Sequence, residues 1–309
     1  MTVDFLQPPV TRTSSGKERR FGFELEFAGV TIDAAAGLVA RQFGGTPVAE
    51  SPFVHRVRDT RVGEFTVEID AEILKNRVYR RHLRELGIEL DNTSLGQSLD
   101  ELIRRVAATV VPCEIITPPM GLDELEQIDA LREQLRLHHA QGTSDSLLYA
   151  FGLHINAEAP ELTSESMLRH LRAFLILYDE LFAESGIDLS RRLTPFIQPF
   201  PAAYRNLVLQ ADYRPSRDRL IDDYLEYNPS RDRPLDMLPL FAWVDADRVG
   251  RQAEHAGSVS QRPAYHYRLP NCQVGQPDWR VATEWNRWVR VECLAADTRR
   301  MGDMLSFHC

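Results

Sequence analysis

The feature of this sequence that most constrains its fold is the stretch Phe21–Phe27 near the N-terminus, which is FGFELEF. Its odd-numbered positions are large and apolar, whereas the even-numbered positions hold a glycine and two glutamates. This period of two is typical of a strand with one buried face, so Glu24 and Glu26 are expected on the opposite face. Same-face residues two positions apart lie roughly 6 to 7 Å from each other. Two carboxylates at that spacing can share bound cations, although a solvated strand face is the plain alternative.

The composition of the 309 residues is that of a globular protein able to bury a large core, with 43% hydrophobic and 26% charged residues. One domain of this length is possible if a large sheet forms its core. The net charge of −9 disfavours nonspecific nucleic-acid binding, which needs a basic surface. No stretch approaches the roughly 18 to 20 apolar residues of a membrane span, and the N-terminus lacks a signal-peptide core. We therefore expect neither a nucleic-acid nor a membrane partner.

The four cysteines are too few and too scattered for a disulfide framework or for paired zinc ligands. They are Cys113, Cys272, Cys293 and Cys309. We expect reduced thiols and a cytoplasmic location.

Residues 1–19 contain proline, serine and glycine with little periodicity, so a flexible lead-in is expected there. Residues 20–309 are predicted to form a single domain. Within it, residues 71–109 are charged and irregular and look inserted, with a helix expected over 98–109.

Four further segments have strand patterns that bring polar side chains to one face. These polar positions are Glu68 and Asp70 in residues 53–70, Glu114 in 110–116, His154 and Asn156 in 149–156, and His266 and Arg268 in 265–269. Glu114 is the single acid of an apolar run, where burying a carboxylate is costly unless something pairs with it. Gly152 shares a face with His154, and a strand glycine often marks the close approach of a ligand or backbone. The plain alternatives are an exposed sheet face for Glu114 and a structural role for His154.

Apolar positions at helical spacing predict helices over residues 33–43, with Asp33 as N-cap, and over 122–139, 163–184 and 278–297. The tryptophans of the last helix are expected to pack on the sheet, and His138 and His139 to lie on the surface. Residues 187–262 are rich in proline and arginine. An Arg-rich loop facing an acidic site would suit an anionic substrate, although many of these charges are ordinary surface charges.

Taken in order, these polar strand positions resemble the carboxylate-amine ligase superfamily of glutamate-cysteine ligase and glutamine synthetase, and most closely its amidoligase family. The likeness is carried by GFELEF at 22–27, EIITPP at 114–119, GLHIN at 152–156 and YRL at 267–269. The segment 228–240, NPSRDRPLDMLPL, is also similar to a segment of some amidoligases. The likeness spans about residues 20–297, and its strength comes from the ordered set rather than from any single motif.

The resemblance implies an α+β fold, in which a curved, mainly antiparallel sheet carries helices on its outer face, as in the glutamine synthetase catalytic domain. It also implies that the concave side binds ATP through Mg²⁺. Transferred by position, the metal ligands are Glu24, Glu26, Asp70, Glu114 and His154. The nucleotide or phosphate contacts would come from the same glutamates with His154, Asn156 and Arg268, and Arg268 and His154 would be catalytic. One position departs from the family pattern, because His266 stands where the family has a glutamate, and Mg²⁺ prefers oxygen ligands.

The implied activity is ATP-dependent joining of a carboxylate to an amine through an acyl phosphate, giving an amide or isopeptide bond. Its substrates would be a small-molecule or peptide carboxylate and an amine, and a companion enzyme of the same pathway is plausible. Two alternatives stay open. One is a metal-dependent hydrolase that uses the same acids, and the other is a non-catalytic paralogue that binds nucleotide or another ligand, an alternative favoured by His266.

Overall fold

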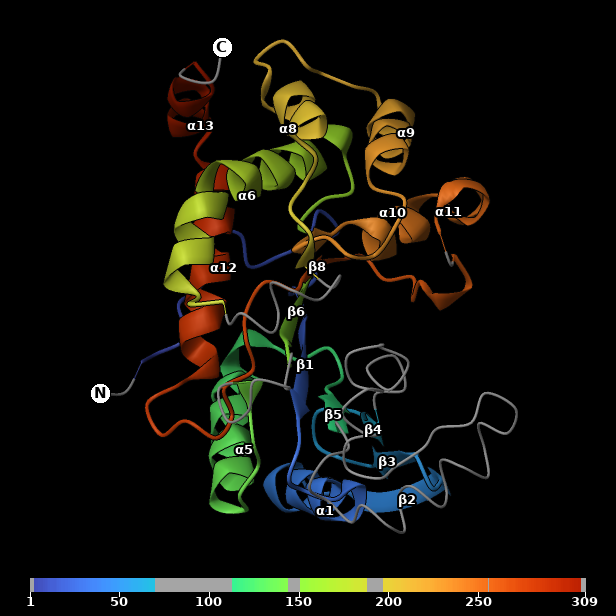
Figure 1. The fold of residues 1–309 in the computed structure, drawn as a ribbon, viewed down its shortest axis with the longest axis vertical. Helices are drawn as coiled ribbons and strands as arrows, with labels where there is room; N and C mark the ends of the chain where they lie inside the picture. Colours follow the sequence, from blue (N-terminus) through green and yellow to red (C-terminus); the bar gives the residue numbers. More distant parts are fainter. Residues whose placement is uncertain (1–2, 70–112, 144–150, 188–196, 255, 307–309) are drawn as a thin grey trace, which may run out of the picture.

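A computed structural model describes residues 3–69, 113–143, 151–187, 197–254 and 256–306. The predicted segment 71–109, Asp70 and the first residues of the predicted strands at 110 and 149 lie outside this part. The described residues form an α+β fold with one antiparallel sheet of eight strands in the order β2-β3-β4-β5-β1-β6-β8-β7 (Figure 1). The strands are β1 Phe21–Phe27, β2 Thr46–Ser51, β3 Val54–Arg58, β4 Phe65–Ile69, β5 Cys113–Ile116, β6 Leu153–Glu158, β7 Leu235–Asp236 and β8 Ala264–Tyr267.

Nine α-helices lie in the described part of the chain. They are α1 Ile32–Phe43, α5 Glu126–Leu137, α6 Ser164–Glu184, α8 Ala202–Leu209, α9 Arg217–Tyr227, α10 Leu238–Val244, α11 Ala246–Gln252, α12 Val281–Ala296 and α13 Thr298–Leu305. Figure 1 shows α5, α6 and α12 along one side of β1, β6 and β8. None of the helices described is long and apolar enough to cross a bilayer.

The core lies between the apolar face of the sheet and these helices, as the alternation in β1 predicts. The odd-numbered residues of β1 are fully buried. The ring of Phe21 meets Trp285 of α12 edge-on, with centroids 4.8 Å apart, and Trp288 lies 5.6 Å from both Tyr265 and Tyr267 of β8. Burial of aromatic surface of this size dominates core energetics. The expectation that the tryptophans of α12 pack on the sheet is confirmed.

The structure corrects several predicted element boundaries. The N-cap of α1 is Thr31 and not Asp33, because the Thr31 side chain accepts the Ala34 N–H at 3.2 Å. The predicted helix 122–139 is a short 3-10 turn, Leu122–Glu124, followed by α5. Helices α8 to α11 lie within the Pro- and Arg-rich residues 187–262, where the sequence patterns predicted no helix. As predicted, His138 and His139 are exposed.

Residues 3–19, the described part of the predicted flexible lead-in 1–19, make specific contacts with α12. The Leu6 N–H donates to Asn286 Oδ1 at 2.8 Å, and the Trp285 indole N–H donates to the Leu6 carbonyl at 2.8 Å. Arg19 and Glu292 form a bidentate ion pair with both N···O distances at 2.7 Å and side chains that are at most 1% exposed. This segment is therefore joined to the helical layer at several points.

Candidate active site

The polar face of the sheet gathers side chains from five strands, β1, β5, β6, β7 and β8. The β1 register places Glu24 opposite His154 of β6, and Glu26 opposite Glu114 of β5. Further along, Asn156 lies opposite His266 of β8, and His266 opposite Asp236 of β7. Seven polar side chains of this face are buried, with exposures of at most 9%: Glu24, Glu26, Glu114, His154, Asn156, Asp236 and His266. Hence the sheet brings together five of the residues predicted from the sequence.

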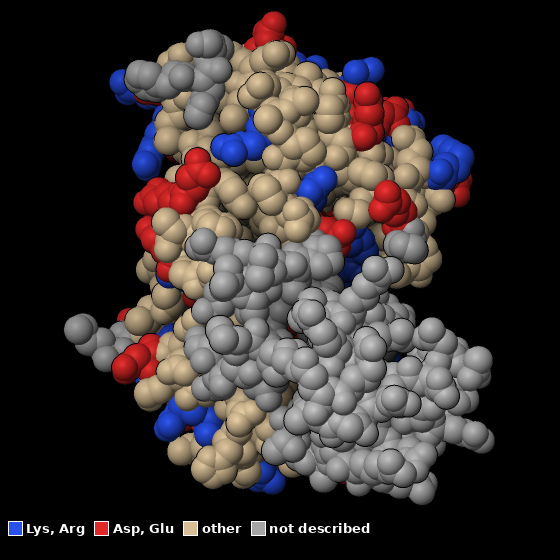
Figure 2. All heavy atoms as spheres, viewed as in Figure 1, with Lys and Arg blue, Asp and Glu red and all other residues tan. Residues whose placement is uncertain are grey.

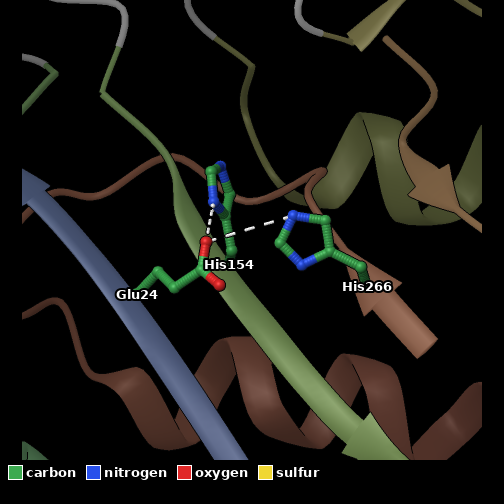
Figure 3. A group of neighbouring side chains, drawn as sticks. All are labelled: Glu24, His154 and His266. Carbon is green, nitrogen blue, oxygen red and sulfur yellow. Dashed lines mark hydrogen bonds and ion pairs between the residues drawn. The ribbon is translucent and has the colours of Figure 1, made fainter. Parts of the chain in front are cut away.

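The carboxylate of Glu24 is the centre of a hydrogen-bonded group (Figure 3). Its Oε2 lies 2.9 Å from Nδ1 of His154, and its Oε1 accepts the Asn156 amide N–H at 2.8 Å. Arg262 Nη2 forms an ion pair with the same Oε1 at 3.2 Å. The His266 Nε2 atom lies 4.0 Å from Oε2.

The neighbours of Glu24 keep it ionised. Burial alone would raise the pKa of this carboxyl, but His266, His154 and Arg262 outweigh burial and hold the pKa well below its usual value. Burial lowers the pKa of His266 well below its usual value, against the attraction of Glu24, and Arg262 lowers it further. Arg262 places a guanidinium cation beside Glu24 and His266.

Glu26 and Glu114 form a second group with the other nitrogen of His154. His154 Nε2 lies 3.4 Å from Glu26 Oε1, and the backbone N–H of Gly152 donates to Glu26 Oε2 at 2.6 Å. The backbone just before β6 thus lies against the Glu26 carboxylate. The β4 register also places Glu68 opposite Glu114.

Two sets of three side chains in the described residues could hold a metal ion, with their ligand atoms within 4.8 Å of one another. They are Glu24, His154 and His266, and Glu26, Glu114 and His154. The second set has two carboxylates and one imidazole, which suits a hard divalent cation. The first has a single carboxylate, two imidazoles and the Arg262 guanidinium on that carboxylate, which suits Mg²⁺ poorly.

Arg268 lies at the end of β8 in a separate polar group. Its Nη1 donates to the Arg231 carbonyl at 2.9 Å and is 4.0 Å from Asp236 Oδ2. Arg231 Nε donates to the same Asp236 oxygen at 3.2 Å. Burial raises the pKa of Asp236, while Arg231 and Arg268 oppose that rise.

Sequence reasoning missed Arg262 and Asp236. Arg262 lies just before β8, where no strand pattern identifies it, and Asp236 belongs to a strand of two residues. The one signal in the sequence for Asp236 is the segment 228–240, which contains this residue. The family resemblance of that segment does not by itself distinguish Asp236 from its neighbours. Asp70, predicted as a metal ligand, lies outside the described residues.

Comparison with known proteins identifies one family. The model of the family described as "putative amidoligase enzyme" matches residues 17–290 of this chain. The same comparison found no curated protein and no solved structure that matches this chain. The matched residues include β1 and every other strand of the sheet, so the family match and the polar group on the sheet cover the same part of the chain.

Proposed function

Because the chain belongs to the amidoligase family, we propose that it is an ATP-dependent ligase that joins a carboxylate to an amine. The product would be an amide or isopeptide bond, and the carboxylate substrate would be a small molecule or a peptide. The proposal includes a fold like that of the glutamine synthetase catalytic domain, in which the nucleotide would bind on the concave side of a curved sheet.

The observation that carries the proposal is the meeting of Glu26, Glu114 and His154 on one face of the sheet, with ligand atoms within 4.8 Å. These three residues come from three different strands. Two buried carboxylates so close together repel each other unless a cation is shared between them. This set of donors would hold Mg²⁺, which in phosphoryl transfer neutralises charge that develops on the phosphate oxygens.

In the proposed reaction, an oxygen of the substrate carboxylate attacks the γ-phosphorus of ATP and ADP leaves, which gives an acyl phosphate. The amine nitrogen then attacks the acyl carbon, phosphate leaves, and the nitrogen loses a proton. Arg268 would stabilise the charge on the transferring phosphoryl group and on the departing phosphate, and His154 would contribute through the cation that it helps to hold. No nucleophile of the protein is required.

A second candidate is a paralogue that binds nucleotide without turning it over. The contacts of Glu24 favour this candidate, because His154, Asn156 and Arg262 already contact the Glu24 carboxylate oxygens. Such a protein would bind magnesium ATP and release no ADP. A hydrolase, by contrast, would act without nucleotide.

The test is an ADP-release screen of the purified protein with magnesium ATP and a panel of amino acids and peptides. Glu26→Gln should abolish release, since it removes one of the two carboxylates. Glu18→Gln is the matched control, because Glu18 is 68% exposed and pairs only with Arg12 among the described residues. ADP release that survives Glu26→Gln would contradict the proposed role of the carboxylates. Nucleotide binding with no ADP release for any substrate pair would favour the paralogue.

A further inference from the structure

We propose that Arg262 is the cation of the Glu24–His154–His266 group, so that Glu24 orients His154 and does not ligate a metal. This inference rests on the proposed function, because it assigns which side chains of that site would hold a divalent ion. It makes Glu24 a positioning residue and Arg262 its counter-ion, and it leaves metal binding to Glu26, Glu114 and His154.

The first support is that three protein donors already use the oxygens of Glu24. Oε2 lies 2.9 Å from His154 Nδ1. Oε1 accepts a hydrogen bond from the Asn156 amide at 2.8 Å and forms an ion pair with Arg262 Nη2 at 3.2 Å. Asn156 is itself fixed, because its Oδ1 lies 2.7 Å from Nδ1 of His266. A metal at Glu24 would have to displace part of this network.

The second support is charge. The Arg262 side chain is only 23% exposed, so water screens the charge of its guanidinium weakly. It also lies 3.0 Å from His266 Nδ1. Since His266 replaces the carboxylate expected from the family resemblance, this group holds one carboxylate, and a guanidinium lies against it. A divalent ion bound to Glu24 would be repelled by the positive charge of Arg262.

The third support is that the two ring nitrogens of His154 face different carboxylates. Nδ1 is directed to Glu24 and Nε2 lies 3.4 Å from Glu26 Oε1. A metal-bound histidine almost always donates its other N–H to a carboxylate or carbonyl, which fixes the tautomer and the orientation of the ring. Glu24 is placed to accept that N–H, and Nε2 is then the nitrogen for a metal shared with Glu26 and Glu114.

The first experiment counts Mn²⁺ ions bound per chain, by isothermal titration, for wild type and two single variants. Glu24→Gln should leave the number unchanged and weaken the affinity about 10- to 100-fold, as loss of a partner of a metal-bound histidine does. Glu26→Gln should lower the number by one. Loss of one Mn²⁺ in Glu24→Gln would overturn the assignment. Circular dichroism and melting temperature serve to check that each variant folds.

The second experiment restores a carboxylate pair next to Glu24 and does not depend on the folding of Glu24→Gln. Combining His266→Glu with Arg262→Met should add one bound Mn²⁺ per chain, because the cation is gone. Combining His266→Glu with Arg262→Lys should not, because a cation remains. An equal number of ions in the two double variants would overturn the role of Arg262.

The two proposals fail in different ways. A wild-type protein that binds no Mn²⁺ would contradict the metal site of the proposed function, and the paired double variants would still decide the role of Arg262. Conversely, ADP release that depends on Glu26, together with loss of an ion in Glu24→Gln, would leave the ligase intact and overturn only the inference.

Discussion

His170 on α6 is a histidine whose charge is suppressed by burial in the fold. It is 5% exposed, and its ring stacks on Tyr265 with centroids 4.7 Å apart. Burial lowers its pKa, which Glu292 partly offsets, while Arg19 and Arg169 lower it further. Below a pH of about 6.5 the unfolded chain therefore binds a proton at this position before the folded protein does. The free energy of unfolding must then decrease as the pH falls.

We predict that His170→Phe, which keeps an aromatic ring beside Tyr265, weakens this pH dependence. One such group contributes at most about 1.4 kcal/mol per pH unit. Urea unfolding between pH 7 and pH 5 measures the pH dependence of the free energy of unfolding. His138→Gln, at an exposed histidine, is the matched control. A slope equal to that of wild type would show that His170 takes up its proton equally in both states.

Single residues of the site could be predicted where the backbone is regular. Period-two alternation in β1 and β6 fixes which side chains share a face, so the placement of Glu24 and His154 followed from the pattern, whereas Glu114 stood out as the single acid of an apolar run. Arg262 did not follow, because it reaches Glu24 from a segment outside any strand and its position depends on tertiary packing. Only the fold determines which of several arginines in that region meets the carboxylate.

At the scale of elements, the N-terminal segment and α12 are connected by one buried ion pair. Besides its two bonds to Glu292, Arg19 donates to the carbonyls of Val10 and Glu158 at 2.7 Å each. The Trp288 indole N–H donates to Glu292 at 2.7 Å. Removing one partner of a buried pair leaves an uncompensated charge.

Arg19→Met should accordingly lower the free energy of unfolding by about 3 to 5 kcal/mol. Replacing both partners, with Arg19→Met and Glu292→Leu, should recover much of that loss, since no buried charge then lacks its partner. Chemical denaturation measures both effects. The exposed pair of Arg12 and Glu18 provides the control, for which Arg12→Met should change stability by less than about 1 kcal/mol. A double variant as unstable as the single one would mean that packing, and not charge, holds the segment.

Elements were predictable in type more often than in extent. The apolar spacing in α6 and α12 placed both helices to within three residues at each end. In α1 the sequence offers Thr31 and Asp33 as possible caps, and the structure uses Thr31, because its extended backbone directs the hydroxyl at the Ala34 N–H. Asp33 lies in the first turn, where its charge still suits the helix dipole. Helices α8 to α11 were missed because prolines and charges between them hide short apolar patterns.

For the molecule as a whole, the proposed function predicts that magnesium ATP stabilises the folded state. Binding to the native state alone adds about 2.7 kcal/mol when ligand exceeds its Kd 100-fold. In a domain of this size that corresponds to a rise in Tm of roughly 5 °C. Differential scanning fluorimetry should show the rise for wild type and Glu18→Gln and not for Glu26→Gln. An equal rise for Glu26→Gln would place the nucleotide away from the carboxylates.

The α+β class and the antiparallel sheet were predictable, because strand patterns separated by irregular or helical segments, together with the family resemblance, indicate them. The order of the eight strands was not, since it depends on which edges meet in space. Acidic and basic side chains are mixed over the described part of the face in Figure 2, in keeping with the net charge of −9 and with no continuous basic surface there.

The strand order has a consequence for how this protein acquires activity during folding. β1 lies between β5 and β6, and the side chains of Glu24 and Asn156, which are hydrogen-bonded across β1 and β6, are 132 positions apart in the chain. No hairpin or helix that forms early contains more than a fraction of the site. Distant pairings of this kind are the slow ones in folding. A nascent or partly refolded chain therefore lacks the assembled site until the central strands pair.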